Sequence, residues 1–302
     1  MIELQITETD HLRPLESFLR NLFPDATPGY VTTLIRKGHA SVSTDRPPAR
    51  LLATGDIVRL KESAKTLSLM EKRPRPVDII HEDSDIIVIN KPSGVAMHRT
   101  GRDEETVIDR VSHLFHSRGL SLKPRPVNRL DRGTSGVVIL AKGGKAAGIY
   151  GRMIKGAGFE KRYLAVCHGD VREGGEITTP IEGKEATTRF EVIATTGTLS
   201  LLLVTPFSQI RIHLSLSRHP IVGDRRYGGV VPSEPPGFFL HSLQTAVSRD
   251  GGKRSFVAPL PPHFLDVIKH SFAGAEMDIM THLLGLVSSS IPTHPHPTPG
   301  ER

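Results

Sequence analysis

The first sixty residues place their apolar side chains at the spacings of short helices and strands. Residues 15–22 repeat apolar positions every three to four residues, which predicts an amphipathic helix. A second helix is predicted over 27–37, because a proline stands at its start and a glycine follows its end. Strands are predicted at 40–43 and at the end of 51–58. Residues 1–62 are therefore expected to form a small α/β domain.

The longer remainder of the chain mixes strands with helices. The apolar run 137–140 predicts a buried strand, and alternation over 163–167 predicts another. Helices are predicted over 104–118 and 144–156, because apolar residues recur on one face of each. This mixture predicts an α+β fold in which helices pack on the flanks of a mixed sheet.

Composition suggests where these parts begin and end. Residues 63–76 are rich in Lys, Arg and Pro and are predicted to be a charged linker. Residues 77–272 then form the main domain. Towards its end the chain becomes rich in Ser, Thr, Pro and His, so 273–302 is predicted to be a disordered tail.

The stretch 127–136, with the sequence VNRLDRGTSG, carries the clearest chemical signal. Asp131 stands between Arg129 and Arg132, and small residues follow. Opposite charges keep an aspartate ionised, and small residues let a bulky ligand approach the backbone. Taken alone, such a triplet is more often a solvated loop or a structural ion pair. In a cationic and open loop it is also a candidate nucleophile for a polyanionic substrate.

The whole string resembles the catalytic loop of the RluA-type pseudouridine synthases, the family that modifies uridines of large-subunit ribosomal RNA. That loop reads H-R-L-D-x-x-T-S-G, with the aspartate as nucleophile. The resemblance implies that Asp131 is the nucleophile here. Asn128 stands where the family usually has histidine.

A second match covers 160–169, with the sequence EKRYLAVCHG. It resembles the family's K-x-Y-x-A-x-V-x-G strand, whose tyrosine lies against the target base. The resemblance therefore implies that Tyr163 contacts uracil. Without the resemblance, a core tyrosine on a half-buried strand would be an equally good interpretation.

A third match covers 205–214 and 219–228, which resemble T-G-R-x-H-Q-I-R-x-H-L and G-H-P-I-x-G-D-x-x-Y-G. The resemblance implies that Arg211 pairs with the nucleophilic aspartate, a task that suits a guanidinium because it stays charged and binds a carboxylate with two hydrogen bonds. Read alone, it would more often be a surface charge. Pro206, Phe207 and Ser208 replace the usual Gly, Arg and His, which removes an expected RNA contact.

Weaker similarities at 81–94 and 239–243 extend the resemblance to about residues 75–268. It implies a mixed, largely antiparallel central sheet flanked by helices. The basic N-terminal module resembles the small ribosomal-protein-type RNA-binding domain that often precedes the catalytic domain. The residues predicted to contact RNA are Asn128, Arg129, Arg132, Thr134, Gln209, Arg36 and Lys37.

Bulk composition agrees with an RNA partner. The formal net charge is +7 and the isoelectric point is about 9.6, which favours an anionic partner. The single cysteine, Cys167, excludes an internal disulfide and suits a reducing cytoplasm. No secretory signal or membrane span is visible. We expect a cytoplasmic monomer.

The expected function is isomerisation of specific uridines to pseudouridine in ribosomal or transfer RNA. An isomerisation needs no energy source or redox carrier, so no cofactor and no metal are expected. One alternative is a non-catalytic RNA-binding or ribosome assembly factor on the same fold. Another is a carboxylate-dependent hydrolase acting on a sugar, with Asp224 as the second carboxylate.

Overall fold

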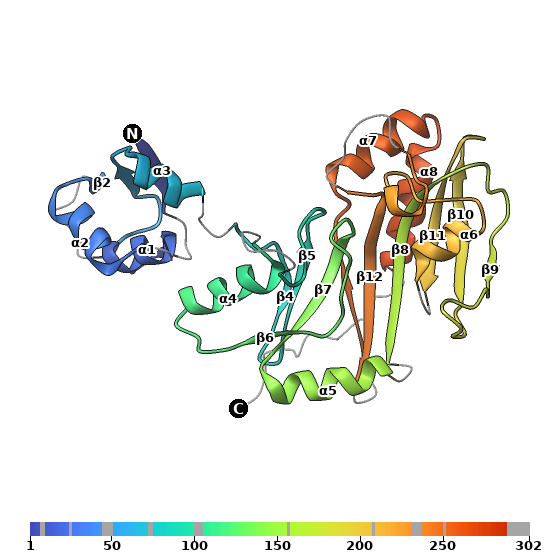
Figure 1. Cartoon of the computed structure of the whole chain (residues 1–302), viewed down its shortest axis with the longest axis horizontal. Helices are drawn as coiled ribbons and strands as arrows, with labels where there is room; N and C mark the ends of the chain where they lie inside the picture. Colours follow the sequence, from blue (N-terminus) through green and yellow to red (C-terminus); the bar gives the residue numbers. More distant parts are fainter. Residues whose placement is uncertain are drawn as a thin grey trace, which may run out of the picture. The chain divides into compact units, whose positions relative to one another are not determined.

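The computed structural model divides the chain into two compact units (Figure 1). It describes residues 1–6, 10–23, 26–43, 51–71, 75–99, 105–155, 158–206, 209–230, 237–249 and 252–288. The first unit comprises 1–76 together with 113–120, and the second comprises 77–112 and 121–302. The boundary at 76/77 falls at the end of the predicted linker.

The first unit contains a three-stranded antiparallel sheet in the order β1-β3-β2. Its elements are β1 (Ile2–Gln5), α1 (Leu15–Leu22), α2 (Pro28–Arg36), β2 (Ala40–Ser43), β3 (Ile57–Leu60) and α3 (Ala64–Glu71). Both predicted helices and both predicted strands are present. The sequence analysis missed β1, because only Ile2 and Leu4 carry its apolar pattern.

The predicted linker is partly wrong, since most of 63–76 belongs to the first unit. Helix α3 occupies Ala64–Glu71, and its Leu69 joins the core cluster that contains Leu19 and Val58. The Thr66 hydroxyl is buried against Tyr30 Oη and Ser63 Oγ, at 2.9 and 2.7 Å. A charged composition suggested a solvated segment, but the buried Leu69, with the partly buried Met70 beside it, packs the helix against this core.

The second unit is a mixed sheet with helices on its flanks, as predicted (Figure 1). Its strands are β4 (Ile79–Glu82), β5 (Ile86–Lys91), β6 (Pro124–Pro126), β7 (Ser135–Lys142), β8 (Phe159–His168), β9 (Gly175–Ile177), β10 (Thr188–Thr195), β11 (Leu199–Pro206), β12 (Leu240–Arg249) and β13 (Gly252–Val257). Its helices are α4 (Val107–Ser117), α5 (Gly144–Lys155), α6 (Ile210–Leu216), α7 (Pro262–Ser271) and α8 (Glu276–Ser288), with the short 3-10 helix η2 (Arg225–Tyr227). Helix α4 begins in this unit and ends among the residues grouped with the first.

The sheet runs in the order β4-β5-β7-β12-β8-β11-β10-β9, with β13 beside β12 and β6 beside β7. Among the described strands, β7 and β12 pair in parallel and the other pairs are antiparallel. Figure 1 shows β7, β12 and β8 side by side in the middle of the sheet, with α5 across one end. The expectation of a mixed, largely antiparallel sheet is confirmed.

The central strands are covered on both faces. Residues 137–141 of β7 and 164–167 of β8 have no exposed surface. The strand expected at 163–167 exists, but all five of its side chains are buried. Buried and exposed side chains therefore do not alternate along it, as the sequence pattern had suggested. Near-continuous apolar runs are the pattern that strands buried on both faces require.

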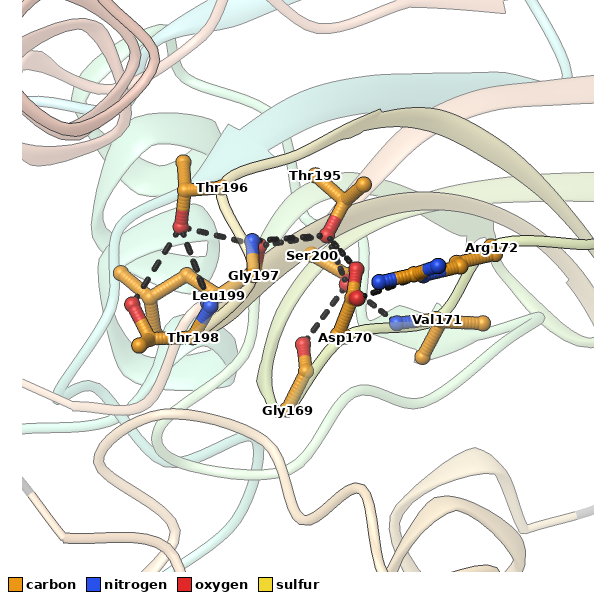
Figure 2. A network of polar contacts seen from close by, with 10 residues as sticks. All are labelled: Gly169, Asp170, Val171, Arg172, Thr195, Thr196, Gly197, Thr198, Leu199 and Ser200. Atoms are coloured by element: carbon orange, nitrogen blue, oxygen red, sulfur yellow. Dashed lines mark hydrogen bonds and ion pairs between the residues drawn. The ribbon is translucent and has the colours of Figure 1, made fainter.

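A polar network closes the far end of β8 onto the β10–β11 hairpin (Figure 2). Ser200 Oγ donates a hydrogen bond to the Gly169 carbonyl at 2.8 Å and accepts one from Val171 N at 2.9 Å. Thr195 Oγ1 donates to Asp170 Oδ1 at 2.8 Å. These contacts hold the pairing of Ser200 with Cys167, so the register of β8 against β11 is fixed at the end away from its tyrosine.

The predicted tail is also partly wrong. Residues 276–288 form helix α8, whose Ile279 and Leu283 are buried. The stretch 289–302 lies outside the described residues. No helix in the described part of the chain is long and apolar enough to cross a membrane.

Candidate active site

The second unit contains a cavity of about 520 Å³ that several distant segments line together. The lining residues are Arg129, Leu130, Asp131, Thr134, Lys161, Tyr163, Glu182, Pro206, Gln209, Ile210, Arg211, Ile212, Arg226, Tyr227 and Leu240. They come from the loop before β7, from β8, from the turn before β10, from the end of β11, from α6 and the residue before it, from η2 and from the start of β12. The three residues predicted to be catalytic, Asp131, Tyr163 and Arg211, therefore meet in one cavity.

The loop that carries Asp131 is tied to strand β7 through Asn128. The Asn128 side-chain Nδ2 donates a hydrogen bond to the Val137 carbonyl at 3.1 Å, and Ile139 N donates to Asn128 Oδ1 at 2.7 Å. The residue is only 4% exposed. The structure thus gives Asn128 a structural role, and the prediction that it contacts RNA is corrected.

The other side of the loop is held by a buried lysine. Lys91 has no exposed surface, and its Nζ donates to the carbonyls of Pro92, Val95 and Arg132 at 3.0, 2.7 and 3.1 Å. Burial lowers the pKa of Lys91 to about 7, although the charge of Asp131 acts in the opposite direction. The sequence analysis gave Lys91 no role, because nothing local connects it to a carbonyl 41 residues later.

Glycine at position 136 lets β7 begin directly beside β12. Gly136 has φ +107°, and a Cβ there would collide with the Ser242 carbonyl. The two residues are paired in register between the parallel strands. The small residue noted in the sequence is therefore required by a close approach of two backbones rather than by a ligand.

Arg211 joins two carboxylates. Its Nη1 donates to Asp131 Oδ2 at 2.5 Å, and its Nε and Nη2 donate to Asp224 Oδ2 and Oδ1 at 2.6 and 2.7 Å. The Asp131 side chain is 58% exposed, whereas that of Asp224 is 1% exposed. The predicted pairing of Arg211 with Asp131 is present, and the fork of the guanidinium is occupied by the second, buried carboxylate.

The Arg211 guanidinium is also enclosed by aromatic rings. Its central carbon lies 4.3 Å from the centroid of Phe238 and 4.9 Å from that of Tyr227. Burial alone would lower the pKa of Arg211, but the hydrogen bonds and charges of Asp224 and Asp131 outweigh it and raise the pKa. The arginine therefore stays charged and is held from several sides.

Tyr163 lies on β8 and is 7% exposed. Burial, together with the negative charge of Asp131, raises the pKa of Tyr163 to about 12. The phenol is therefore neutral at physiological pH. In the cavity it can offer an aromatic face and a hydrogen-bond donor, but no phenolate.

The residues predicted to contact RNA fall into separate places. Arg129 and Gln209 are exposed and line the cavity, and Thr134 lines it while being 2% exposed. Arg132 is exposed outside the lining. Arg36 and Lys37 are exposed at the end of α2, in the first unit. Of the unusual triplet, Pro206 lines the cavity, and Phe207 and Ser208 lie outside the described residues.

The cavity also contains charged residues that the sequence analysis did not single out, namely Lys161, Glu182 and Arg226. Glu182 lies in a tight turn with φ +51°, followed by Gly183 with φ +74°. Two hydrogen bonds of 3.0 Å between Ile181 and Lys184 close this turn. In the sequence only Gly183 indicates a turn here, so the position of Glu182 at the cavity could not be predicted.

The arrangement bears on the hydrolase alternative. Asp224 does lie near Asp131, through their common arginine, but it is buried and both its oxygens accept hydrogen bonds from Arg211. It cannot present a carboxylate to a sugar. Among the residues that the structure describes, no group of three or more His, Cys, Asp or Glu is placed to hold a metal ion.

Comparison with known proteins gives consistent similarities. A profile of the family described as RNA pseudouridylate synthase matches residues 85–216. A protein of Aquifex aeolicus (strain VF5) named "Uncharacterized RNA pseudouridine synthase" is 31% identical over 250 residues, which are 73% of this chain and 78% of that protein. Ribosomal large subunit pseudouridine synthase C of Escherichia coli (strain K12) is 30% identical over 254 residues, or 74% and 78% of the two chains. The solved structure of Human RNA Pseudouridylate Synthase Domain Containing 1 is similar with a TM-score of 0.52 at 25% identity, covering 61% of this chain and 84% of that one.

The α+β sheet agrees with the fold of these RNA-modifying isomerases. With these similarities, the chain belongs to the RluA-type family of RNA pseudouridine synthases. It is an RNA pseudouridine synthase, and its substrate class is RNA. The resemblance noted in the sequence is confirmed at the level of the family, the fold and the enzyme class.

Proposed function

We propose that this enzyme converts specific uridines of structured ribosomal or transfer RNA to pseudouridine, with Asp131 as the nucleophile. The observation that carries the proposal is the exposed Asp131 carboxylate, held at 2.5 Å by Arg211 at the edge of the cavity. The relatives whose names specify the ribosomal large subunit favour ribosomal RNA as the first substrate to test.

The chemistry requires the C1′–N1 bond of uridine to break and the uracil to rejoin the sugar through C5. Asp131 is the only exposed carboxylate of the described cavity that is paired with an arginine, so it is assigned to the attack on the bound nucleotide. The hydrogen bond from Arg211 orients this carboxylate. Because all atoms of the uridine are retained apart from an exchange of hydrogen at C5, no other reactant is needed.

Tyr163 is assigned to the uracil. Its neutral ring lines the cavity from a strand that is paired with a neighbouring strand on each side, which suits stacking against a base removed from its own stack. Unstacking costs a few kcal/mol and costs least in loops and bulges of RNA. Arg129 and Gln209 at the same cavity are assigned to contacts with the flanking nucleotides.

The first unit is proposed to add RNA contacts of its own, as a small RNA-binding domain over residues 1–62 extended by α3. Arg36 and Lys37 are exposed at the end of one helix, where cations can meet phosphates. Replacing both with glutamine should weaken RNA binding and reduce its dependence on salt. An unchanged salt dependence would remove the two residues from this role. The enzyme is proposed to act as a monomer in the cytoplasm, where its single cysteine suits the reducing conditions.

The test uses ribosomal and transfer RNA labelled with tritium at uracil C5, prepared from cells that lack this gene. Conversion to pseudouridine releases the label, so release is followed with the wild-type protein and with Asp131→Asn. We expect release by the wild type alone, and carbodiimide mapping of the same RNA then locates the uridine. Circular dichroism of the variant controls for folding.

Two outcomes would contradict the proposal. Appreciable release by Asp131→Asn would remove Asp131 from the nucleophilic role. No release by either protein, with salt-sensitive RNA binding retained, would favour a non-catalytic RNA-binding or assembly factor.

A further inference from the structure

Lys161 shares the cavity with the catalytic residues but has no assigned task. It lies two residues before Tyr163 on β8, so the two side chains share one face of the strand. In the pairing with β12, Lys161 is opposite Thr245 and Tyr163 is opposite Ser242. Both side chains line the same cavity as Asp131.

The other cations of the cavity have contacts that account for them. Arg211 is bound by two carboxylates, and the Arg226 guanidinium lies 5.5 Å from the centroid of the Tyr227 ring. Arg129 is exposed to water. Lys161 differs from all three, because it is half-buried and no hydrogen bond or ion pair joins its amine to any residue that the structure describes.

This amine is therefore partly removed from water without a compensating anion. Burial lowers the pKa of Lys161, and no neighbouring charge acts against it. Neither acidic residue of the cavity pairs with Lys161. Asp131 is bound to Arg211, and Glu182 makes no ion pair with Lys161. Burying a charged amine without an anion costs free energy. An anion that entered the cavity beside Lys161 would offset this cost.

The substrate class supplies such an anion. Each nucleotide of RNA is flanked by phosphates that carry a full negative charge, whereas the carbonyl oxygens of uracil carry only partial charges. A lysine ammonium is a compact point charge that binds one phosphate oxygen without the planar geometry that a guanidinium demands. A lysine two residues from Tyr163 on the same face of the strand is thus suited to the backbone of the nucleotide rather than to its base.

We propose that Lys161 binds a phosphate that adjoins the target uridine and so fixes how deeply this nucleotide enters the cavity. The inference rests on the proposed function, since it takes Asp131 and Tyr163 as the groups that meet the sugar and the base. Lys161 is in this role a positioning residue.

The test compares Lys161→Gln with Lys161→Arg and with Lys145→Gln, which removes an equal charge from an exposed site on α5 outside the cavity. The substrate is a short RNA that contains the mapped uridine, and tritium release gives kcat and KM. We expect Lys161→Gln to raise KM about tenfold and to change kcat less than about threefold, because a phosphate contact is made equally before and during the reaction. Lys161→Arg should restore most of the loss, and Lys145→Gln should behave as the wild type.

A second measurement identifies the bound group. The same RNA is prepared with a neutral methylphosphonate on the 5′ or the 3′ side of the target uridine. If Lys161 binds one of these phosphates, that substitution raises KM for the wild type but not further for Lys161→Gln. Circular dichroism and the kcat of Lys161→Gln exclude misfolding as the cause.

The outcomes separate this inference from the proposed function. Tritium release by the wild type, with KM unchanged in Lys161→Gln or with the two substitutions fully additive at both phosphates, would overturn the role of Lys161 alone. Absence of release by the wild type would overturn the proposed function, and the present inference with it.

Discussion

Two regions of the second unit each present a carboxylate to the same arginine, and they do so in opposite surroundings. The loop 127–136 holds Asp131 with 58% of its side chain exposed, whereas the turn 219–228 holds Asp224 with 1% exposed. Asp131 receives one hydrogen bond from Arg211, and Asp224 receives two. The arginine is thus fixed by its buried partner, and this leaves the exposed partner oriented but still accessible.

This difference shows how a reactive group can be aimed without being buried. An exposed ion pair contributes little to stability, because water and salt screen it. A buried pair is expensive to break, because removal of one partner leaves an uncompensated charge. We therefore expect function to depend chiefly on Asp131 and stability chiefly on Asp224. The following experiments test this division.

The largest effect is expected from Arg211→Lys, which damages both regions at once. A lysine cannot bridge two carboxylates or fill the space between the rings of Phe238 and Tyr227. Tritium release should fall more than about 10³-fold, and the free energy of unfolding in urea by about 3 kcal/mol. Arg152→Lys, on the exposed surface of α5, is the matched control. Wild-type rates in Arg211→Lys would show that the bridge is not needed.

The division itself is tested by comparing Asp224→Asn with Asp131→Asn. Asp224→Asn should lower the free energy of unfolding by about 3 kcal/mol, because it leaves the Arg211 charge with one exposed partner. Asp131→Asn should cost less than about 1 kcal/mol while removing turnover. Urea denaturation of both variants gives the two values. Equal losses of stability would contradict the contrast drawn between the two regions.

A pH dependence should reveal how the Asp131 loop is held by Lys91. The pKa of Lys91 is lowered to about 7 in the folded protein, so between about pH 7 and 10 the unfolded chain binds one proton more. Stability contributed by this residue therefore rises with pH in that window, by up to about 1.4 kcal/mol per unit, and is flat below it.

The measurement is the free energy of unfolding of the wild type and of Lys91→Met at several pH values. The variant also loses three hydrogen bonds, so its absolute stability falls at every pH. The diagnostic quantity is the slope, which should be absent from the variant. Parallel curves for the two proteins would mean that Lys91 stays charged when buried.

The smallest effect is expected from Asn128→Ala, which loosens the Asp131 loop from β7. Loss of two hydrogen bonds to the backbone of β7 should lower the free energy of unfolding by about 1–2 kcal/mol. The salt dependence of RNA binding should not change, since the side chain is buried. Arg129→Ala is the matched control on the same loop and should show the reverse. A reduced salt dependence in Asn128→Ala would restore the RNA contact that the sequence predicted.

The two regions also differ in how well the sequence revealed them. Around Asp131 the chemical groups are adjacent in the chain, so arginines, aspartate and small residues could be interpreted together. Asp224 was noted only as a possible second carboxylate, because nothing local joined it to Asp131. Its contact with Arg211 spans 13 residues and depends on the turn that follows α6. The sequence therefore did not reveal the contact between Arg211 and the buried Asp224.

The same holds for the elements that hold the cavity. The sequence predicted the strand of Tyr163, but the burial of both its faces depends on β11 and β12, which pair with it from distant parts of the chain. The segment 63–76 was misjudged from its charges, because the buried Leu69 packs α3 against the core of the first unit. Glu182 stands in no motif, and Lys161 stands in the K-x-Y motif without an assigned role, since the significance of both residues lies in the cavity that they line.

From the sequence by itself, periodicity predicted the mixture of strands and helices. The resemblance of local motifs to those of a known family implied the family, the fold class and the roles of Asp131, Tyr163 and Arg211, because these motifs are contiguous in the chain. The tertiary structure alone decided which groups are exposed and which are buried. It made Asp131 accessible and Asp224 inaccessible, used Asn128 and Lys91 to hold a loop, and left Lys161 without a partner. The physical reason is that burial and charge pairing arise between segments far apart in the chain, and the strength of an electrostatic contact depends on the water that those segments exclude.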